Sequence, residues 1–491
     1  MKLLVLFSIF FPIASGLCLL LKLLGKERCE FEVELLNKIV MIILTLSVIA
    51  AVVFAISASE GMRMELFEIV KGIPVLLKVD GISRLFVIVF SIVWEACMFY
   101  AFGYMNHEEN KQRFYGFYLI VYGVLVGLCF SGNLITMYLF FELMSLTSMP
   151  MVLHSGTHEA VMAALKYLFY SMFGAYCGLF GIFVYSKYCA TLEFVAGGSL
   201  VASNAVVLVA TILCIIGFGV KAGMFPMHAW LPTAHPLAPT PASAVLSSII
   251  VKCGVLSIVR VIFYVVGASY IRGTYVQYVW MILSLITVFM GSMLAFKTKL
   301  FKKRLAYSTV SQVSYILFGL STLTTAGFIG AMLHVVFHAF IKAGLFMSAG
   351  SFIVATGKKN ADDYVAIGKV MPKTVWAYTI VSLALVGIPP LSGFVSKWYL
   401  AEGALTSNYY LVGVVGVAVL LVSALLTAGY LVPIFTKGFL PGKDVKPQDG
   451  VKETGASMWA PIAAMAVLTI VLGIFPNGLV NFIQTILGGI L

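Results

Sequence analysis

The sequence predicts an all-α membrane protein that crosses the lipid bilayer about fourteen times. Of its 491 residues, 61% are hydrophobic and only 11% are charged, and the mean hydropathy is +1.03. Apolar runs of about twenty residues, the length that spans a bilayer as a helix, recur along the whole chain. Because lipid offers no hydrogen-bond partners, each run must satisfy its own backbone groups, which favours helices over strands.

Fourteen segments follow one another, joined mostly by short links. They cover residues 3–24, 36–58, 82–104, 114–131, 133–153, 159–186, 204–225, 241–267, 274–296, 305–322, 325–355, 374–400, 411–436 and 459–487. The first segment resembles a secretory signal, but its apolar stretch is too long and no small-residue cleavage site ends it. We therefore expect a retained helix there.

Two interrupted segments indicate an internal repeat. The fourth to eighth and the ninth to thirteenth segments each contain one interrupted member, in fourth place, which predicts two inverted five-helix repeats. The expected divisions are N-terminal helices at 1–105, a first repeat at 106–270, a second repeat at 271–440 and a C-terminal helix at 441–491. Coincidence is the alternative to a repeat.

The net charge of +12 orients the segments. Lysine and arginine gather in the links after the first, ninth, eleventh and thirteenth segments, whereas the opposite links around 270–276 and 401–410 carry only Arg272 and Glu402. By the positive-inside rule, the basic links are cytoplasmic and both termini lie outside. Nucleic-acid binding would also explain a basic chain, but no basic and aromatic patch supports it.

Titratable side chains lie inside the apolar segments. Lys221, Lys252, Lys342 and Lys397 occupy four different segments, and Glu142 interrupts the run NLITMYLFFELMSL. A charge at the bilayer centre costs about 2.5–3.5 kcal/mol on insertion scales, so such residues are interpreted as functional. Together they predict a route for protons or cations across the membrane.

The seventh segment breaks next to Lys221. It leads into GFGVKAGMFPMHAWLPTAHPLAPTPASA, in which five prolines lie within sixteen residues. Proline removes a backbone donor and clashes with the preceding turn, and broken helices at membrane depth commonly mark ion sites. A simple helix end followed by a polar loop is the alternative.

The twelfth segment breaks next to Lys397. Glycine and proline interrupt SLALVGIPPLSGFVSKWYL, and Lys397 follows this break whereas Lys221 precedes its own. Reversal of that order is what inverted repeats predict.

Glu142 and Lys221 are the expected ion pair of the first repeat. A carboxylate beside a buried lysine favours the charged amine, so the two groups should titrate as a coupled system. A static salt bridge that fastens two helices is the alternative. Lys252 has no acidic residue in its own segment and is expected to receive a proton laterally.

His334, His338 and Lys342 follow an i, i+4, i+8 pattern and therefore share one helix face. Histidine titrates near neutral pH and suits a proton relay. The H-x-x-x-H spacing can also clamp zinc, but no third ligand is evident, so we expect no metal. A packing role alone is the remaining alternative.

Accessory positions give weaker signals. Glu95 is a second intramembrane carboxylate, suited either to a partner contact or to a lateral channel, and Lys166 either joins the relay or snorkels to the interface. His228 and His235 lie in the proline-rich turn, where they either gate an entrance or sit in a solvated loop. Arg260 is expected at the membrane interface. A polar stripe that either holds water or bonds neighbouring helices comprises Tyr307, Ser308, Ser311, Gln312 and Tyr315.

Motifs for cofactors are absent from the sequence. The eight cysteines are scattered without a C-x-x-C pair, and there is no Walker motif or dinucleotide fingerprint. We therefore expect no catalytic residue, cofactor or metal within the chain, and an ion gradient or a partner subunit as the energy source. A non-redox subunit of a translocating oxidoreductase would have the same features, so membership of an enzyme stays open.

At these residues the chain resembles the antiporter-like subunits shared by respiratory complex I, Mrp-type sodium/proton antiporters and energy-converting membrane-bound hydrogenases. The motifs are FFELMSL, GFGVKAGMFPMHAWLPTAHPLAPTPASA, LSSIIVKCG, LHVVFHAFIKAGLF and GIPPLSGFVSK. The resemblance implies a fourteen-helix fold with two inverted five-helix repeats and broken helices 7 and 12. It also implies that protons pass through Glu142, Lys221, Lys252, His334, His338, Lys342 and Lys397.

The expected function is therefore the translocation of protons, or of sodium, along a hydrated central chain from Glu142 to Lys397. The expected setting is a multi-subunit complex in a prokaryotic inner membrane, with other membrane subunits as partners and no nucleic acid. The motifs AHPLAPTPASA and GIPPLSGF are more similar to those of the D-type Mrp subunit and hydrogenase-type members than to those of the longest complex I subunit. The alternative is a proton-pumping subunit of a complex I-type NADH/quinone oxidoreductase. A carrier for organic solutes is disfavoured, because the intramembrane charges lack a ligand-shaped cluster.

Overall fold

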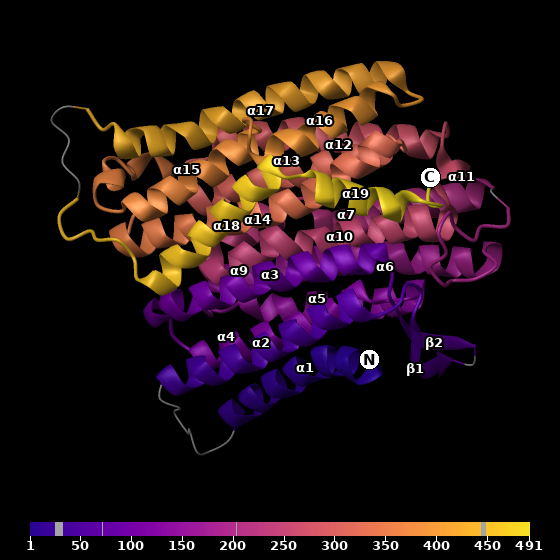
Figure 1. Ribbon diagram of the computed structural model, residues 1–491, viewed down its shortest axis with the longest axis horizontal. Helices are drawn as coiled ribbons and strands as arrows, with labels where there is room; N and C mark the ends of the chain where they lie inside the picture. The colour runs from indigo at the N-terminus through magenta and orange to yellow at the C-terminus, as the bar shows by residue number, and fades with distance from the viewer. Residues whose placement is uncertain (25–32, 71, 203, 443–447) are drawn as a thin grey trace.

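The computed structural model is a bundle of long helices that run side by side between two ends (Figure 1). It describes residues 1–24, 33–70, 72–202, 204–442 and 448–491. In the first half of the chain the helices are α1 (Lys2–Leu24), α2 (Val33–Ser57), α3 (Gly81–Tyr104), η1 (Met105–His107), α4 (Lys111–Cys129), α5 (Leu134–Val152), α6 (His158–Tyr188), α7 (Ala205–Ala222) and α8 (Leu231–Leu237).

The chain then forms one continuous helix, Thr240–Val266, which we call the central helix. It comprises α9 (Thr240–Val245), the π-helical η2 (Leu246–Ile250), α10 (Val251–Val259) and the π-helical η3 (Arg260–Val266). The later helices are α11 (Ala268–Ile271), α12 (Tyr275–Lys297), α13 (Phe301–Ser321), α14 (Thr325–Thr356), η4 (Ala361–Asp363), η5 (Ile367–Lys369), α15 (Pro372–Val386), α16 (Ser392–Leu405), α17 (Tyr410–Phe439), α18 (Ala456–Ile474) and α19 (Asn477–Leu487).

The all-α membrane prediction is confirmed. Twelve helices in the described part of the chain are long and apolar enough to cross a membrane. Two predicted spans are not among the twelve. One is α13, whose first turn contains Lys302, Lys303 and Arg304, and the other is the pair α15–α16, which a break divides into two short helices. With these two included, the structure has a helix or a broken helix at each of the fourteen predicted segments.

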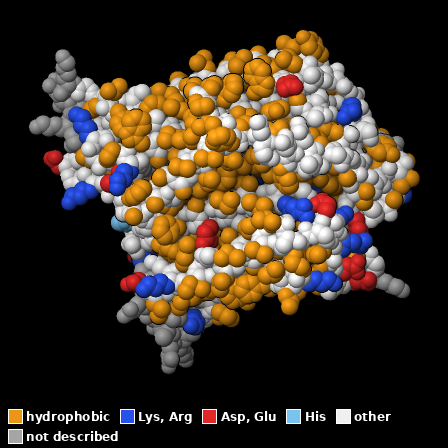
Figure 2. Space-filling view, viewed as in Figure 1, with side chains coloured by type: hydrophobic (Ala, Val, Ile, Leu, Met, Phe, Trp, Pro, Cys, Tyr) orange, Lys and Arg blue, Asp and Glu red, His pale blue; other side chains and the backbone are white. Residues whose placement is uncertain are grey.

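The core lies around two helices that other helices enclose. The central helix and α14 are buried along their whole apolar windows, whereas α17 and α2 expose much of theirs. Figure 2 shows the outer surface as a broad hydrophobic band, with Lys and Arg side chains concentrated toward its two ends. Polar side chains on the central helix and on α14 are therefore shielded from lipid by the surrounding bundle.

Three of the four basic links predicted to share one side meet at one end. Arg304, after α12, and Lys437, at the end of α17, both lie within 4.0 Å of Asp362 in the link after α14. At the opposite end, the Tyr409 hydroxyl donates to the carbonyl of Gly273 at 2.9 Å. Figure 1 places the N- and C-termini toward that opposite end. The basic residues at 25–32 and 443–447 lie outside the described residues.

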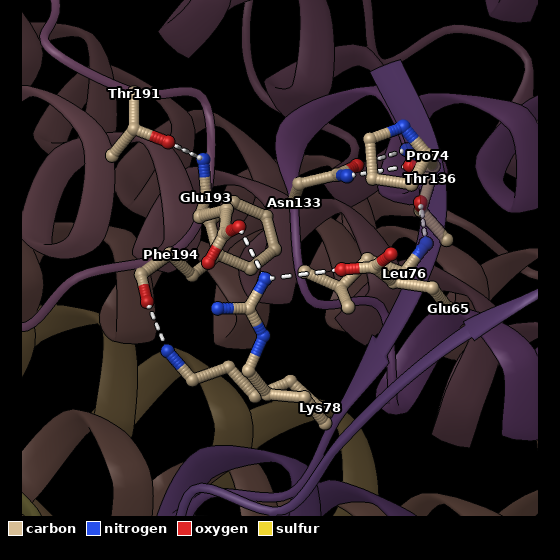
Figure 3. Close-up of polar contacts among 10 residues, drawn as sticks. Glu65, Pro74, Leu76, Lys78, Asn133, Thr136, Thr191, Glu193 and Phe194 are labelled. Atoms are coloured by element: carbon tan, nitrogen blue, oxygen red, sulfur yellow. Dashed lines mark hydrogen bonds and ion pairs between the residues drawn. The ribbon is translucent and has the colours of Figure 1, made fainter. Parts of the chain in front are cut away.

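A β-hairpin between α2 and α3 was not predicted. Strands β1 (Arg63–Val70) and β2 (Ile73–Lys78) pair antiparallel, with Arg63 opposite Lys78 and two irregularities in the register. In Figure 3 the strand residues Pro74, Leu76 and Lys78 reach the start of α5 and the 191–194 link: Lys78 Nζ donates to the Phe194 carbonyl at 2.7 Å. The hairpin thus connects the N-terminal helices to α5 and to the 191–194 link.

The last predicted segment, 459–487, is two helices and not one. α18 ends at Ile474, and Pro476 precedes α19. Proline cannot continue a helix because it lacks a backbone donor. The short α19 then packs against α3 and α14 at the end where the chain terminates.

Candidate functional site

Lys221 lies at the end of α7, inside a cage of hydroxyl groups. Its Nζ donates to Ser145 Oγ at 2.8 Å, to Tyr167 Oη at 2.7 Å and to Ser171 Oγ at 3.1 Å. The three acceptors come from α5 and α6, and the Lys221 side chain is buried. All three donors of the ammonium group are therefore satisfied without a carboxylate.

Glu142 does not form the predicted ion pair with Lys221. Among the described residues, no lysine, arginine or histidine nitrogen lies within 4.0 Å of a Glu142 carboxylate oxygen. Glu142 Oε1 is buried and has no hydrogen-bond partner among these residues. The two charges still interact through space. The hydroxyl cage explains the correction, because Ser145, three residues beyond Glu142 on α5, occupies the contact that the carboxylate was expected to make.

The helix of Lys221 packs closely on the central helix because of a glycine. A Cβ at Gly254 would lie 2.5 Å from the carbonyl oxygen of Phe218 and 3.1 Å from the Cβ of Lys221. Any larger residue would therefore separate the two backbones. Lys252, two residues before Gly254, therefore lies on the helix that directly adjoins α7.

Lys252 lies at the middle of the central helix, just after its first π-helical stretch. The side chain is fully buried, and Nζ donates to the carbonyl of Ser247 at 2.9 Å, five residues earlier. π-helical turns are rare and frequently occur at functional sites. Here one precedes a buried lysine that has no carboxylate partner among the described ion pairs.

Lys342 lies on α14 and contacts α13. Its Nζ donates to Ser308 Oγ at 2.7 Å and to the Leu305 carbonyl at 3.1 Å, and Ser308 in turn accepts from the hydroxyl of Tyr430 at 2.7 Å. Ser308 belongs to the polar stripe predicted on α13. The buried lysine is thus linked through hydroxyl groups to α17.

His334 and His338 lie on the same face of α14, as their spacing predicts. Their rings are stacked with centroids 5.7 Å apart, and His334 Nδ1 is 2.9 Å from Ser396 Oγ. His334 Nε2 and both ring nitrogens of His338 are buried and have no hydrogen-bond partner in the described protein. Both polar side-chain atoms of Gln312 on α13 are likewise buried and unpaired among the described residues.

Lys397 binds the end of α15 at the second break. Nζ donates to the carbonyls of Leu385 at 2.6 Å and Val386 at 2.8 Å, which are the last two residues of α15. These carbonyls have no partner within their own helix, so the ammonium group caps the negative end of the helix dipole. Gly387 leaves room for it, because a Cβ there would lie 3.0 Å from Lys397 Cδ.

Neighbouring members of this set of buried residues lie within range of one another's charge. Lys221 interacts with Glu142 on one side, and Cys253 interacts with both Lys221 and Lys252. The His338 ring then interacts with Lys252, Lys342 and Lys397. The positions predicted from sequence are therefore gathered in one row that passes from α5 through the central helix and α14 to α16.

The accessory residues have different surroundings. Lys166 Nζ donates to Thr233 Oγ1 on α8 at 3.1 Å, so it adjoins the first break. His228 lies within that break and stacks on Phe225, with centroids 6.3 Å apart. Glu95 on α3 instead accepts from Thr45 on α2 at 2.5 Å, within the N-terminal helices.

His235 is fully buried in α8 and does not lie in a solvated loop. Arg260 is likewise buried, 2% exposed, and forms a two-point ion pair with Asp80 at 2.5 and 2.9 Å. This ion pair joins the last part of the central helix to the residue that precedes α3, and it is shielded from solvent. Burial alone would raise the pKa of the Asp80 carboxyl, but the Arg260 charge and its hydrogen bonds outweigh burial and hold this pKa below the ordinary 3.8.

Sequence reasoning missed the hydroxyl groups that surround the lysines. Ser145, Tyr167 and Ser171 lie on α5 and α6, and Ser396 lies one residue before Lys397. A polar residue inside an apolar span was the available signal for all of them. Asp80 had a signal of its own, because it begins α3 with a capping box.

The fold and the site together define a polytopic helical membrane protein with two broken helices and a buried row of titratable side chains. The family described as "NADH:quinone oxidoreductase/Mrp antiporter, TM" matches residues 131–425, and "NADH-Ubiquinone oxidoreductase (complex I), chain 5 N-terminus" matches residues 71–115. The chain belongs to this family of antiporter-like membrane subunits.

Similar proteins come from three kinds of complex. The N-type subunit of the NADH-quinone oxidoreductase of Desulforudis audaxviator is 31% identical over 83% of this chain and 84% of its own length. The D-type subunit of the Na(+)/H(+) antiporter of Alkalihalophilus pseudofirmus is 29% identical over 81% of this chain and 80% of its own length. Hydrogenase-4 component B of Escherichia coli is 32% identical over 66% of this chain, which corresponds to 50% of that longer protein.

Solved structures share the fold. A chain of the Mrp complex from a Dietzia species superposes with a TM-score of 0.86, covering 100% of this chain and 98% of its own, at 22% identity. A chain of the archaeal membrane-bound sulfane sulfur reductase gives 0.84, at 22% identity, over 99% of both chains. A chain of complex I from Thermus thermophilus gives 0.82, at 21% identity, also over 99% of both chains.

Proposed function

We propose that this chain translocates protons, or sodium ions, as one membrane subunit of a multi-subunit complex. The observation that carries the proposal is the row of buried titratable residues from Glu142 through Lys221, Lys252, His338 and Lys342 to Lys397. A static scaffold has no need of buried lysines without carboxylate partners, because each one destabilises the fold. Intramembrane ionisable residues are the usual components of proton relays.

Water joins the members of the row. Buried polar atoms are normally hydrogen-bonded to protein or to ordered water. The unpaired nitrogens of His334 and His338 lie between Lys252 and Lys397, and the unpaired amide of Gln312 lies on α13, which packs against α14. Hydroxyl groups complete the route, since a hydroxyl can accept one proton and donate another. Lys166 and His228 adjoin the first break and serve as accessory groups, whereas Glu95 lies outside the row.

The test is the Lys221→Ala variant of the native complex, reconstituted into lipid vesicles. Ion translocation, followed with a pH-sensitive dye, is expected to fall to the background rate while the complex assembles normally. Glu142→Gln should also reduce the rate strongly. Full transport by the assembled Lys221→Ala complex would defeat the proposal.

Two classes of complex fit the relatives: a secondary antiporter without redox chemistry and a redox-driven pump. The similarity to the D-type antiporter subunit and to hydrogenase-4 component B supports a complex of the Mrp or hydrogenase type, and the similarity to the N-type oxidoreductase subunit supports a complex I-type oxidoreductase. Purification of the native complex decides between them. Small membrane subunits alone indicate the antiporter, and iron–sulfur or nickel–iron subunits indicate the pump.

The proposed orientation places the basic end in the cytoplasm of a prokaryotic cell and both termini outside. Its support is the positive-inside rule and the meeting of the basic links at one end. A reporter active only in the cytoplasm should be inactive when fused after Leu491 and active when inserted in the link near Lys358. The reverse pattern would invert the orientation.

A further inference from the structure

A cavity opens at the basic end of the molecule and is not accounted for by the row of buried residues. It has a volume of about 260 Å³ and lies where the end of α3, the end of α8, the start of α13 and the end of α14 meet. Its polar lining consists of Tyr104, Glu108, Lys302 and Lys359. We call it the basic-end cavity.

The charged groups of this cavity are graded in depth. Lys359 is exposed at the mouth, Glu108 is half-buried, and Lys302 is only 8% exposed. Lys302 Nζ donates to the carbonyl of Ala238 at 2.5 Å, and its charge interacts with that of Glu108. A carboxylate and an ammonium group thus line the path from the mouth to the floor.

A buried histidine adjoins the cavity lining in the sequence. His235 precedes the lining residues Pro236, Leu237 and Ala238, and its ring is 0% exposed. Both ring nitrogens lack a hydrogen-bond partner in the described chain, although buried polar atoms are normally satisfied. The ring stacks on Phe346, with centroids 4.8 Å apart.

His235 lies between the cavity and the central row. Its ring interacts with the charge of Lys302 on the cavity side and with that of Lys342 on the other. Phe346, on which the ring stacks, is one helical turn beyond Lys342 on α14.

We propose that the basic-end cavity is the entrance through which protons reach the row from the basic side, and that His235 passes them to Lys342. The proposal rests on the proposed function. A proton from water or from the Glu108 carboxyl binds one nitrogen of the neutral imidazole, the other nitrogen releases a proton to the neutral Lys342 amine, and the imidazole is neutral again. Two nitrogens that can each bind a proton suit histidine to this step.

The first experiment measures transport. In the reconstituted native complex, His235→Phe keeps the stacked, buried ring but cannot titrate, and we expect proton uptake from the basic side to fall at least about tenfold, as for loss of a general acid–base group. Glu108→Gln, on the cavity wall, should slow uptake by a smaller factor. The matched control is Glu109→Gln, since Glu109 is exposed next to Glu108 and does not line the cavity; it should transport at the normal rate.

The second experiment measures access without transport. Ile353→Cys on α14, in a variant whose native cysteines are replaced by serine, places a single thiol in the cavity lining, and a membrane-impermeant maleimide added on the basic side should label it. Failure to label Ile353→Cys would overturn the entrance, as would normal transport by both His235→Phe and Glu108→Gln. If these variants transport normally while Lys221→Ala does not, the entrance is wrong and the proposed function stands. If Lys221→Ala also transports normally, the proposed function itself fails.

Discussion

At the two broken helices, different side chains bind the backbone carbonyl groups near the helix end. At the first break, the carbonyl of Val220 accepts from the backbone N–H of Gly223 at 3.0 Å and also from the indole Nε1 of Trp230 at 2.8 Å. At the second break, the open carbonyls of Leu385 and Val386 accept from Lys397 itself. A neutral tryptophan therefore leaves Lys221 free to bond hydroxyl groups, whereas Lys397 is both a titratable group and a helix cap.

In the proposed relay, the difference bears on how each lysine would exchange protons. The hydroxyl partners of Lys221 can accept a proton and donate another, so its own hydrogen bonds are a path. Carbonyl oxygens only accept, so Lys397 must exchange protons through its remaining donor. Lys397 is half-buried and Lys221 is buried, which fits a terminal position in the row for Lys397 and an internal position for Lys221.

Substitution of Lys397 should separate its two roles and gives the largest expected effect. Lys397→Ala removes both the proton site and the cap, so we expect transport to fall about 100-fold and the thermal unfolding midpoint of the complex to drop. Lys397→Arg restores donors for the carbonyls but does not release its proton. It should therefore recover the midpoint without recovering transport. Full transport by Lys397→Arg would show that Lys397 is only a cap.

Removal of one cage hydroxyl should have an intermediate effect. Tyr167→Phe deletes a 2.7 Å acceptor of Lys221, and since one such bond contributes about 1 kcal/mol, transport should slow by roughly tenfold or less. The matched control is Tyr185→Phe, on the same helix, whose hydroxyl bonds Thr211 and no lysine. Equal slowing in the two variants, measured by vesicle uptake, would contradict a relay role for the cage.

The glycines that end the two half-helices should give the smallest effect. Gly223 and Gly387 both cap their helices with positive φ, 76° and 97°. Alanine at either position should cost about 1 kcal/mol of folding stability, because a side chain disfavours that conformation. Only Gly387→Ala should also alter transport, since its Cβ would contact Lys397, whereas that of Gly223 would contact Leu231. Equal transport by the two assembled variants would remove this distinction.

The sequence predicted most of the fold because each membrane span can be recognised from its own stretch of sequence, as a long apolar run. It also located both breaks, since proline and glycine disrupt a helix wherever it lies. The hairpin at 63–78 was not predicted, because only helical runs are expected within the membrane. Its local signal was there: alternating residues on either side of Gly72, whose φ is 82°.

The sequence identified the titratable residues but not their partners. A lysine in an apolar span is conspicuous wherever the span lies, whereas its contacts depend on which helix faces meet. Lys221 bonds Ser145 and not Glu142, and Arg260 pairs with Asp80, which lies 180 residues away in the sequence. Such pairings are tertiary, so no spacing within either segment encodes them.

The glycine contact between α7 and the central helix also limits how charge can move. Backbone touches backbone at Gly254, so those two helices behave as one rigid body, with no soft layer of side chains that would let them slide. In the proposed relay, a step between Lys221 and Lys252 would then be made by rotation about side-chain bonds, a motion of picoseconds to nanoseconds, whereas displacement of whole helices takes microseconds or longer. We therefore expect the slowest event of the proposed transport cycle to be a different one.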